Sequence, residues 1–163
     1  MFYIAYGANI NPLFLRKRCP DAKYLEDGYL MGYKLTFRRC RGKSFVALEE
    51  SENSSDQVQA ILWWLSDSDV KALDQYVCSL GVFRKEDTTI TCGRRIRKGF
   101  MYVMDGGEKS LPPQDHFDYI VRGYDLAGFD YSPLIEALRS IDPHRYDKVE
   151  RSIREKMKLG PIV

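Results

Sequence analysis

The chain has 163 residues, of which 44% are hydrophobic and 13% aromatic, enough for one domain with a buried core. Its 29% of charged residues are spread without a long polar tract, which argues against disorder, and no apolar run approaches the roughly 18 residues of a membrane helix. The formal net charge is +2. The opening "MFYIAYG" lacks the basic start and cleavage site of a signal peptide, so a cytoplasmic protein is expected.

The cysteines and histidines give no metal-binding pattern. The four cysteines are not spaced as C-x-x-C, and the chain has only two histidines. We therefore expect reduced thiols, no metal site and no cofactor.

Basic residues gather at residues 16–18, 38–43 and 94–98. These clusters are either solvated hairpin ends or a positive rim that attracts a small anionic ligand. No nucleic-acid-binding motif accompanies them, so binding to nucleic acid is not expected.

The first third of the chain predicts strands around one short helix. A buried strand at residues 2–6 reaches Gly7, and Asn11 caps a helix at 11–19. Alternating apolar and polar residues predict a strand at 29–40, a turn at 41–43 and a returning strand at 44–50. A polar loop covers residues 51–57.

The rest of the chain predicts two strand segments followed by helices. An apolar strand at 58–65 precedes a helix at 66–77 capped by Ser66, and strands at 83–92 and 94–104 form a hairpin around Gly93. Helices are predicted at 115–128 and 131–141, and a charged helical extension at 142–163 of the domain formed by residues 1–141. The predicted class is α+β: a small mixed, mostly antiparallel, barrel-like sheet with helices packed outside.

Five segments, in order, resemble the gamma-glutamylcyclotransferase-like family, over roughly residues 1–138. The matching positions are Tyr6-Gly7-Ala8-Asn9; Leu30, Gly32, Tyr33, Leu35 and Phe37; Leu73, Asp74 and Tyr76; Phe83-Arg84-Lys85; and Pro113, Phe117, Ile120 and Gly123.

The resemblance implies a chemistry in which the α-amine of a gamma-glutamyl substrate attacks its own γ-carbonyl and releases 5-oxoproline. In the family a glutamate moves the proton, and the loop after the first strand holds the substrate through backbone N–H groups. At the glutamate's position this chain has Val77. No catalytic residue is therefore expected, unless Glu86 or Asp87 on the next strand, or Glu49, replaces the missing acid.

Three further positions lose a polar group relative to the family pattern: Ala8, Phe83 and Phe117. They predict a drier pocket whose backbone N–H groups at residues 7–9 still receive an anion, with Phe83, Phe117 and Tyr119 stacking on a planar ring. Arg84, Lys85 and the 94–98 hairpin supply counter-charge. The predicted ligand-binding residues are Tyr6, Gly7, Ala8, Asn9, Val77, Phe83, Arg84, Phe117 and Tyr119.

Three functions remain open from the sequence. The favoured one is a non-catalytic protein that binds or sequesters a small anionic, nucleotide-like molecule. The second is an active cyclotransferase with a substitute acid, and the third is an interaction module that uses residues 145–158. A homo-oligomer is also left open, through the strand at 58–65 or through Val149, Ile153 and Met157.

Overall fold

The computed structural model describes residues 1–144, 147, 151 and 155. The predicted helical extension at 142–163 lies mostly outside these residues. So do the predicted partner-binding segment at 145–158 and the three apolar residues proposed for a dimer.

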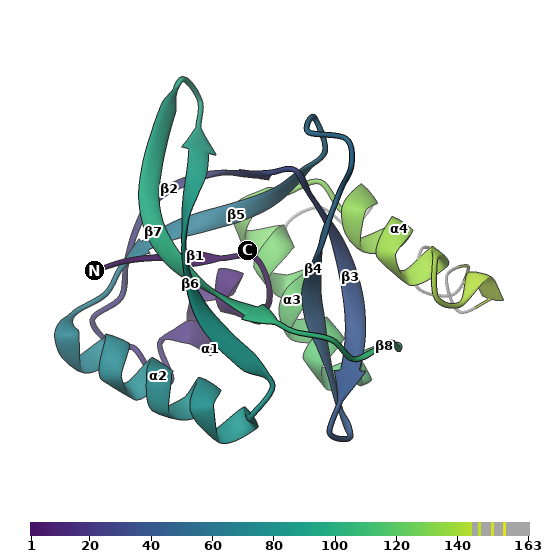
Figure 1. Cartoon of the computed structure of the whole chain (residues 1–163), viewed down its shortest axis with the longest axis horizontal. Coiled ribbons are helices and arrows are strands. Elements are labelled where there is room, and N and C mark those ends of the chain that lie inside the picture. Colours follow the sequence, from purple (N-terminus) through teal and green to yellow (C-terminus); the bar gives the residue numbers. More distant parts are fainter. Residues whose placement is uncertain (145–146, 148–150, 152–154, 156–163) are drawn as a thin grey trace.

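Five strands form a closed barrel (Figure 1). Their order around the barrel is β1 (Phe2–Ala5), β5 (Gln57–Trp64), β2 (Lys23–Met31), β6 (Phe83–Cys92) and β7 (Arg95–Met104). Neighbours are antiparallel except β1 and β7, which meet in parallel where Tyr3 is opposite Phe100. The strands bury Ile4, Leu62 and Met101 completely, so the core begins inside the barrel.

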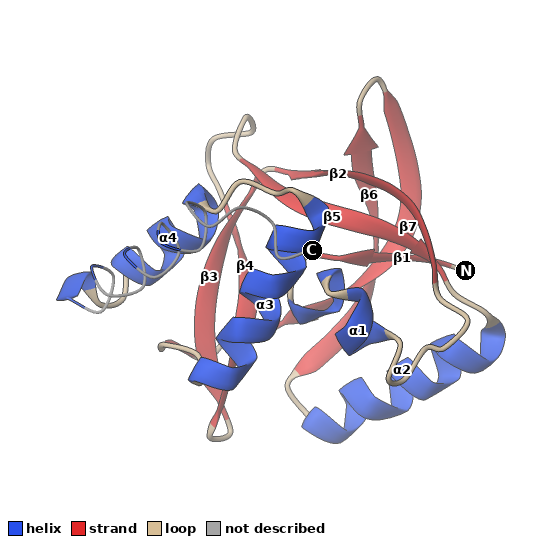
Figure 2. Ribbon diagram, turned by 180° about the vertical axis from the view of Figure 1, so that it is seen from behind, coloured by secondary structure: helices blue, strands red, loops and turns tan. Residues whose placement is uncertain are grey.

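A second sheet contains β3 (Tyr33–Cys40), β4 (Lys43–Glu50) and β8 (Glu108–Lys109), with β3 in the middle. The β3–β4 hairpin turns at Arg41 and Gly42, both with positive φ. Helix α3 (Gln114–Ala127) lies beside this sheet (Figure 2), and its Phe117 ring packs 6.1 Å from the ring of Phe37 on β3. Helix α4 (Ser132–Arg139) also contacts β3.

The predicted strand at 29–40 is two strands in two sheets. Gly32 has φ +80°, which interrupts the extended backbone, and its N–H donates to the Asp56 carbonyl at 2.6 Å. Residues before it pair with β5, and residues after it pair with β4. β2 also begins at Lys23, earlier than predicted. The sequence gives no signal for its first half, because that half is exposed and charged and carries no apolar alternation.

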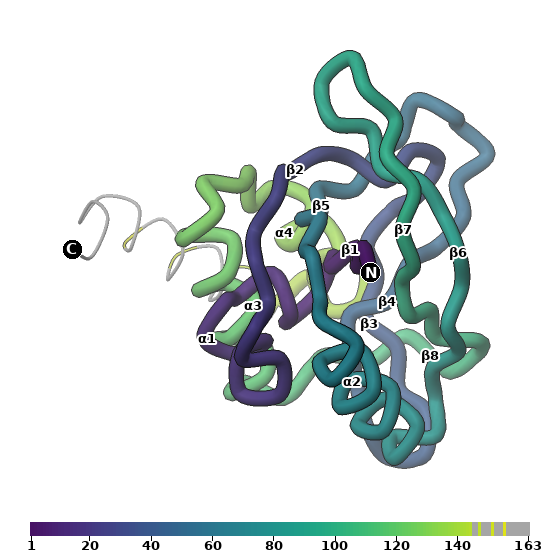
Figure 3. Tube along the Cα trace, turned by 90° about the vertical axis from the view of Figure 1, so that its left-hand side faces the viewer, coloured from purple at the N-terminus to yellow at the C-terminus, as the bar shows by residue number. Residues whose placement is uncertain are grey.

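The helices begin where expected but differ in length. Helix α1 (Pro12–Leu15) follows a 3-10 turn, η1 (Ala8–Ile10), and Asn11 caps it by accepting from the Leu13 N–H at 2.9 Å. Helix α2 (Asp67–Leu80) is capped by Ser66 as predicted and runs to Gly81, whose φ is +68°. Both α1 and α2 lie at the lower end of the barrel (Figures 1 and 3).

The α+β, barrel-like class is confirmed. β5 pairs along one edge with β1 and along the other with β2, so the homo-oligomer left open through strand 58–65 cannot form by pairing at an edge of this strand. Among the described residues, none of the helices combines the length and the apolar character of a membrane span.

Candidate functional site

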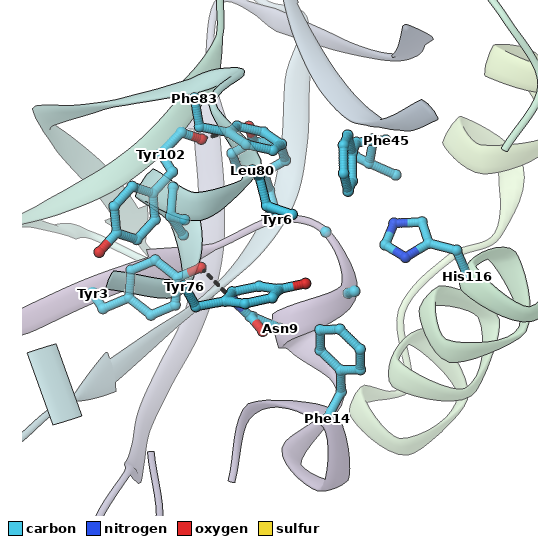
Figure 4. Close-up of a pocket in the computed structure, with 14 residues that line it drawn as sticks. Tyr3, Tyr6, Asn9, Phe14, Phe45, Tyr76, Leu80, Phe83, Tyr102 and His116 are labelled. Carbon is cyan, nitrogen blue, oxygen red and sulfur yellow. Dashed lines mark hydrogen bonds between the residues drawn. The ribbon is translucent and has the colours of Figure 1, made fainter. Parts of the chain in front are cut away.

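A cavity of about 90 Å³ lies where the end of β1, the η1 turn, α2, β4 and α3 meet (Figure 4). Most of its wall is aromatic or aliphatic. The lining residues are Tyr3, Tyr6, Gly7, Ala8, Asn9, Phe14, Phe45, Val46, Tyr76, Val77, Leu80, Phe83, Tyr102 and His116.

The loop after β1 is held in place by hydrogen bonds across the cavity wall. The Tyr6 hydroxyl donates to the Tyr102 carbonyl at 2.6 Å, and the Asn9 Nδ2 donates to the Tyr3 hydroxyl at 2.9 Å. The N–H groups of Ala8 and Asn9 stand at the start of the 3-10 turn, where the turn itself offers no acceptor. This loop therefore has the backbone donors that its sequence predicted.

Helix α2 presents an apolar face to the cavity. Leu73, Val77 and Leu80 are three or four positions apart and so share one side of the helix. Val77 is 7% exposed and lines the cavity next to Tyr76 and Leu80. The position lies within α2 rather than at its end, because the helix continues to Leu80.

No Asp, Glu, Lys or Arg is among the described residues that line the cavity. Three of the four positions where the family pattern loses a polar group, Ala8, Val77 and Phe83, lie in its wall. The fourth, Phe117, is buried against Phe37 instead. The cavity is thus apolar at three positions of the wall where the family pattern is polar.

One carboxylate is connected to the wall through a lining side chain. Tyr102 donates a short hydrogen bond to Asp74, whose other partner is the Lys85 ammonium at 3.1 Å. Burial, and then the hydrogen bond to Asp74, raise the pKa of Tyr102 far above its usual value. Tyr102 therefore stays protonated, and its proton is directed at Asp74 rather than left free for a ligand.

Buried hydroxyls at the β1 side of the cavity are also neutral. Burial raises the pKa of Tyr3 and of Tyr6 well above the usual tyrosine value. For Tyr3 the hydrogen bond from Asn9 works in the opposite direction and offsets only part of the effect.

Across the cavity, His116 of α3 faces two phenyl rings. Its ring centroid is 5.6 Å from that of Phe45 and 6.5 Å from that of Phe14, both nearly edge-on. Burial lowers the pKa of His116 below its usual value, and the neighbouring Asp115 carboxylate opposes this shift. The imidazole is therefore neutral near neutral pH.

Six of the nine predicted ligand-binding residues line the cavity: Tyr6, Gly7, Ala8, Asn9, Val77 and Phe83. The structure does not bring Arg84, Phe117 or Tyr119 to it. Arg84 is exposed and paired with Glu86 and, at 2.7 Å, with Asp105. The Tyr119 hydroxyl accepts from Lys17 at 3.2 Å, and its ring packs against Phe14 from outside the lining.

The candidate substitute acids lie elsewhere as well. Glu86 is engaged by Arg84, Asp87 is exposed, and Glu49 is 3.7 Å from Lys109 in the second sheet. None of the three lines the cavity.

Eight of the lining residues were not predicted from the sequence: Tyr3, Phe14, Phe45, Val46, Tyr76, Leu80, Tyr102 and His116. Helical spacing offered a signal for two of them, because Leu80 follows Val77 by three positions and Tyr76 by four. The other residues lie on separate helices and strands, and no local sequence pattern shows that these elements meet. Within the described part of the chain, no group of three or more His, Cys, Asp and Glu side chains is arranged to hold a metal ion.

The fold resembles three solved structures. It is similar to a gamma-glutamyl cyclotransferase, with a TM-score of 0.73 and 22% identity, covering 95% of this chain and 98% of that one. An uncharacterized protein of Homo sapiens, loc79017, matches with a TM-score of 0.72 and 23% identity, covering 94% of this chain and 97% of that one. YkqA from Bacillus subtilis matches with a TM-score of 0.64 and 18% identity over 94% of this chain, which spans 54% of YkqA.

No protein-family model and no curated protein sequence matches the chain. At these levels of identity the structural likeness establishes the fold. The chain has a gamma-glutamyl cyclotransferase-like fold, which confirms at this level the resemblance seen in its sequence.

Proposed function

We propose that this chain is a non-catalytic member of the gamma-glutamylcyclotransferase-like family that binds and holds a small anionic molecule. The observation that carries the proposal is Val77. By the sequence resemblance, residue 77 corresponds to the family's glutamate. In the structure Val77 lines the cavity, and no carboxylate is among the described residues of its lining.

The missing carboxylate matters because the cyclisation needs a group that takes a proton from the attacking amine and returns it to the leaving nitrogen. Valine can do neither, and loss of a general acid–base group typically lowers the rate by about 10²–10⁴-fold. The substitutes suggested by the sequence are engaged or exposed outside the cavity. The alternative of an active enzyme that uses Glu86, Asp87 or Glu49 therefore receives no support from their positions.

The cavity retains features suited to binding. Backbone N–H groups of Ala8 and Asn9 at the start of η1 can receive an anion, and the rings of Phe83, Phe45 and Tyr76 offer surfaces to a planar group. Its volume of about 90 Å³ is smaller than the roughly 150 Å³ that encloses benzene. A ring-sized ligand must therefore leave part of itself outside, and a nucleotide most of itself.

The proposal is tested by a mass balance on the purified chain. The protein is incubated with gamma-glutamyl amines, dipeptides and nucleotide metabolites, and retained and free molecules are identified by mass spectrometry. We expect a small anion to be retained intact without 5-oxoproline. Release of 5-oxoproline in proportion to the protein would overturn the proposal.

Restoring the acid provides the matched test at residue 77. Val77→Glu introduces the missing group, and Val77→Gln introduces a side chain of similar size that cannot exchange a proton. We expect Val77→Glu, but not Val77→Gln, to release 5-oxoproline, with a gain on the order of 10²-fold or more. A folded Val77→Glu variant without turnover would show that Ala8 and Phe83 also separate this cavity from an active one.

A further inference from the structure

His116 is the one side chain, among the described residues lining the cavity, that can carry a positive charge. The sequence pointed instead to Arg84 and Lys85 as counter-charges. In the structure Arg84 pairs with Glu86 and Asp105, and Lys85 pairs with Asp74, so acidic residues already neutralise both.

The imidazole is placed to meet a ligand. His116 lies in the first turn of α3, and its side chain points toward the space between Phe45 and Phe14 (Figure 4). Within the described part of the chain, neither ring nitrogen of His116 has a hydrogen-bond partner. A half-buried imidazole with two unpartnered nitrogens, beside an apolar cavity, can offer a hydrogen bond there.

The charges near His116 come from α3 and from the turn that follows α1. Asp115 is its neighbour on α3, and in the turn after α1 the Lys17 ammonium and the Arg18 guanidinium lie 6.0 and 5.1 Å from the Phe14 ring centroid. β4 contributes the uncharged Phe45 ring. The cavity tyrosines Tyr3, Tyr6 and Tyr102 stay protonated, because burial raises their pKa values.

We propose that His116 is the ligand-contacting residue that selects for an anionic group attached to a planar ring, with part of the ring in the cavity and the anion at the imidazole. This inference rests on the proposed function and identifies the ligand class of that same cavity. Arg18 does not line the cavity, but it adds a second cationic group next to the cavity wall. Its guanidinium stacks 3.4 Å from the centre of the Tyr76 ring, and its Nη1 is buried without a hydrogen-bond partner.

A pH dependence of known sign follows. Without ligand, burial keeps the imidazole neutral near neutral pH, whereas an anion beside it favours the protonated ring and raises its pKa. Binding then takes up a proton, so an anionic ligand must bind more tightly as the pH falls. A neutral ligand of the same shape gains nothing from that proton.

Benzenesulfonate and benzenesulfonamide provide the test. Both present one phenyl ring, but only the sulfonate is charged, and its charge does not change across the range in which histidine titrates. Calorimetry of the full chain at about pH 5.5 and about pH 7.5 gives the dissociation constants. We expect the sulfonate to bind about fivefold or more tightly at the lower pH, and the sulfonamide to bind equally at both.

The variants His116→Gln and His144→Gln separate the two histidines. His144 lies beyond α4, outside the cavity lining, so His144→Gln keeps the pH dependence, whereas His116→Gln removes it. An NMR titration of the His116 imidazole in the natural chain adds a readout that needs no variant: sulfonate raises the pKa of His116.

Sulfonate binding that is independent of pH, an unchanged pH dependence in His116→Gln, or no binding of the sulfonate would each overturn the inference. The mass balance decides the proposed function separately. A retained ligand that is neutral would leave the chain a non-catalytic binding protein, but it would overturn both the anionic ligand class and the role assigned to His116.

Discussion

The polar atoms in the cavity wall are largely engaged with one another. Tyr6 donates to the Tyr102 carbonyl, Asn9 donates to the Tyr3 hydroxyl, and Tyr102 donates to Asp74. Each bond satisfies a group that would otherwise be desolvated without a partner. These hydrogen bonds therefore fix the side chains of the cavity wall without a ligand.

The variant Tyr102→Phe removes one hydroxyl and with it the hydrogen bond to Asp74. We expect the free energy of unfolding to fall by about 1–2 kcal/mol. The loss is no larger because Asp74 is partly exposed, so that water replaces part of the bond. Urea denaturation followed by circular dichroism measures the change.

The matched control is Tyr119→Phe, which removes a hydroxyl whose contact with Lys17 is exposed. There we expect a change within about 0.5 kcal/mol. Equal losses in the two variants would show that the Tyr102–Asp74 bond contributes no special stability.

At the scale of elements, α3 holds the η1 turn in position. Asn11, which is 1% exposed, caps α1 and also donates from its Nδ2 to the Tyr119 carbonyl of α3 at 3.2 Å. Gly123 allows this approach: a Cβ at that position would lie 2.9 Å from the Asn11 nitrogen and 3.2 Å from the Ile10 Cγ2. The cavity loop therefore depends on a helix more than a hundred residues later in the sequence.

Gly123→Ala should push η1 away from α3. Alanine favours the helix by about 1 kcal/mol, but the contact with a backbone nitrogen forces a shift that costs about 1–3 kcal/mol. We expect a net loss of stability in thermal unfolding, together with weaker ligand retention because Ala8 and Asn9 move with η1.

Leu126→Ala, on an exposed part of the same helix, is the control and should retain ligand normally. If Gly123→Ala matched the natural chain in both stability and ligand retention, η1 would be free to move without consequence, and the dependence on α3 would be refuted.

At the scale of the whole molecule, buried tyrosines determine how the fold responds to alkali. Tyr3, Tyr6, Tyr102 and Tyr124 are all buried, and burial raises the pKa of each above the usual value of about 10. Below that pH both the folded and the unfolded chain keep these protons, so the four groups leave stability unchanged. Above it only the unfolded chain loses them.

Stability should therefore fall as the pH rises beyond about 10, by about 1.4 kcal/mol per pH unit for each such tyrosine. Together, four such tyrosines cancel the free energy of unfolding of a typical domain, about 5–15 kcal/mol, within about one to three pH units. Tyrosinate absorbance and circular dichroism, followed together, should show these ionisations coinciding with unfolding. A fold that persists while all eleven tyrosines titrate near their usual pKa would contradict this.

Most of the fold could be predicted because its signals are local. The Ser66 cap, the hairpin around Gly93 and the apolar strand at 58–65 each depend on neighbouring residues, and each is present. The division at Gly32 was missed because alternation alone does not reveal that a strand changes sheet. The first half of β2 was missed because it is exposed and charged.

The candidate site was harder to predict, for a physical reason. Residues 6–9 and 77 were found through a family motif, whereas His116, Phe14 and Phe45 meet only because α3, α1 and β4 converge. Whether Arg84 faces inward or outward depends on the register of the closed barrel, and its pairing with Asp105 joins positions that no local pattern relates.

The closure of the barrel has a consequence for how the chain is made. β1 emerges from the ribosome before its partners β5 and β7, and the bond from Tyr6 to Tyr102 spans 96 positions. At synthesis rates of about 5–20 residues per second, β1 waits about 5–20 seconds for its last partner. During that interval its apolar residues and unpaired edge are exposed, so a nascent chain stalled before β7 is the species most prone to aggregate.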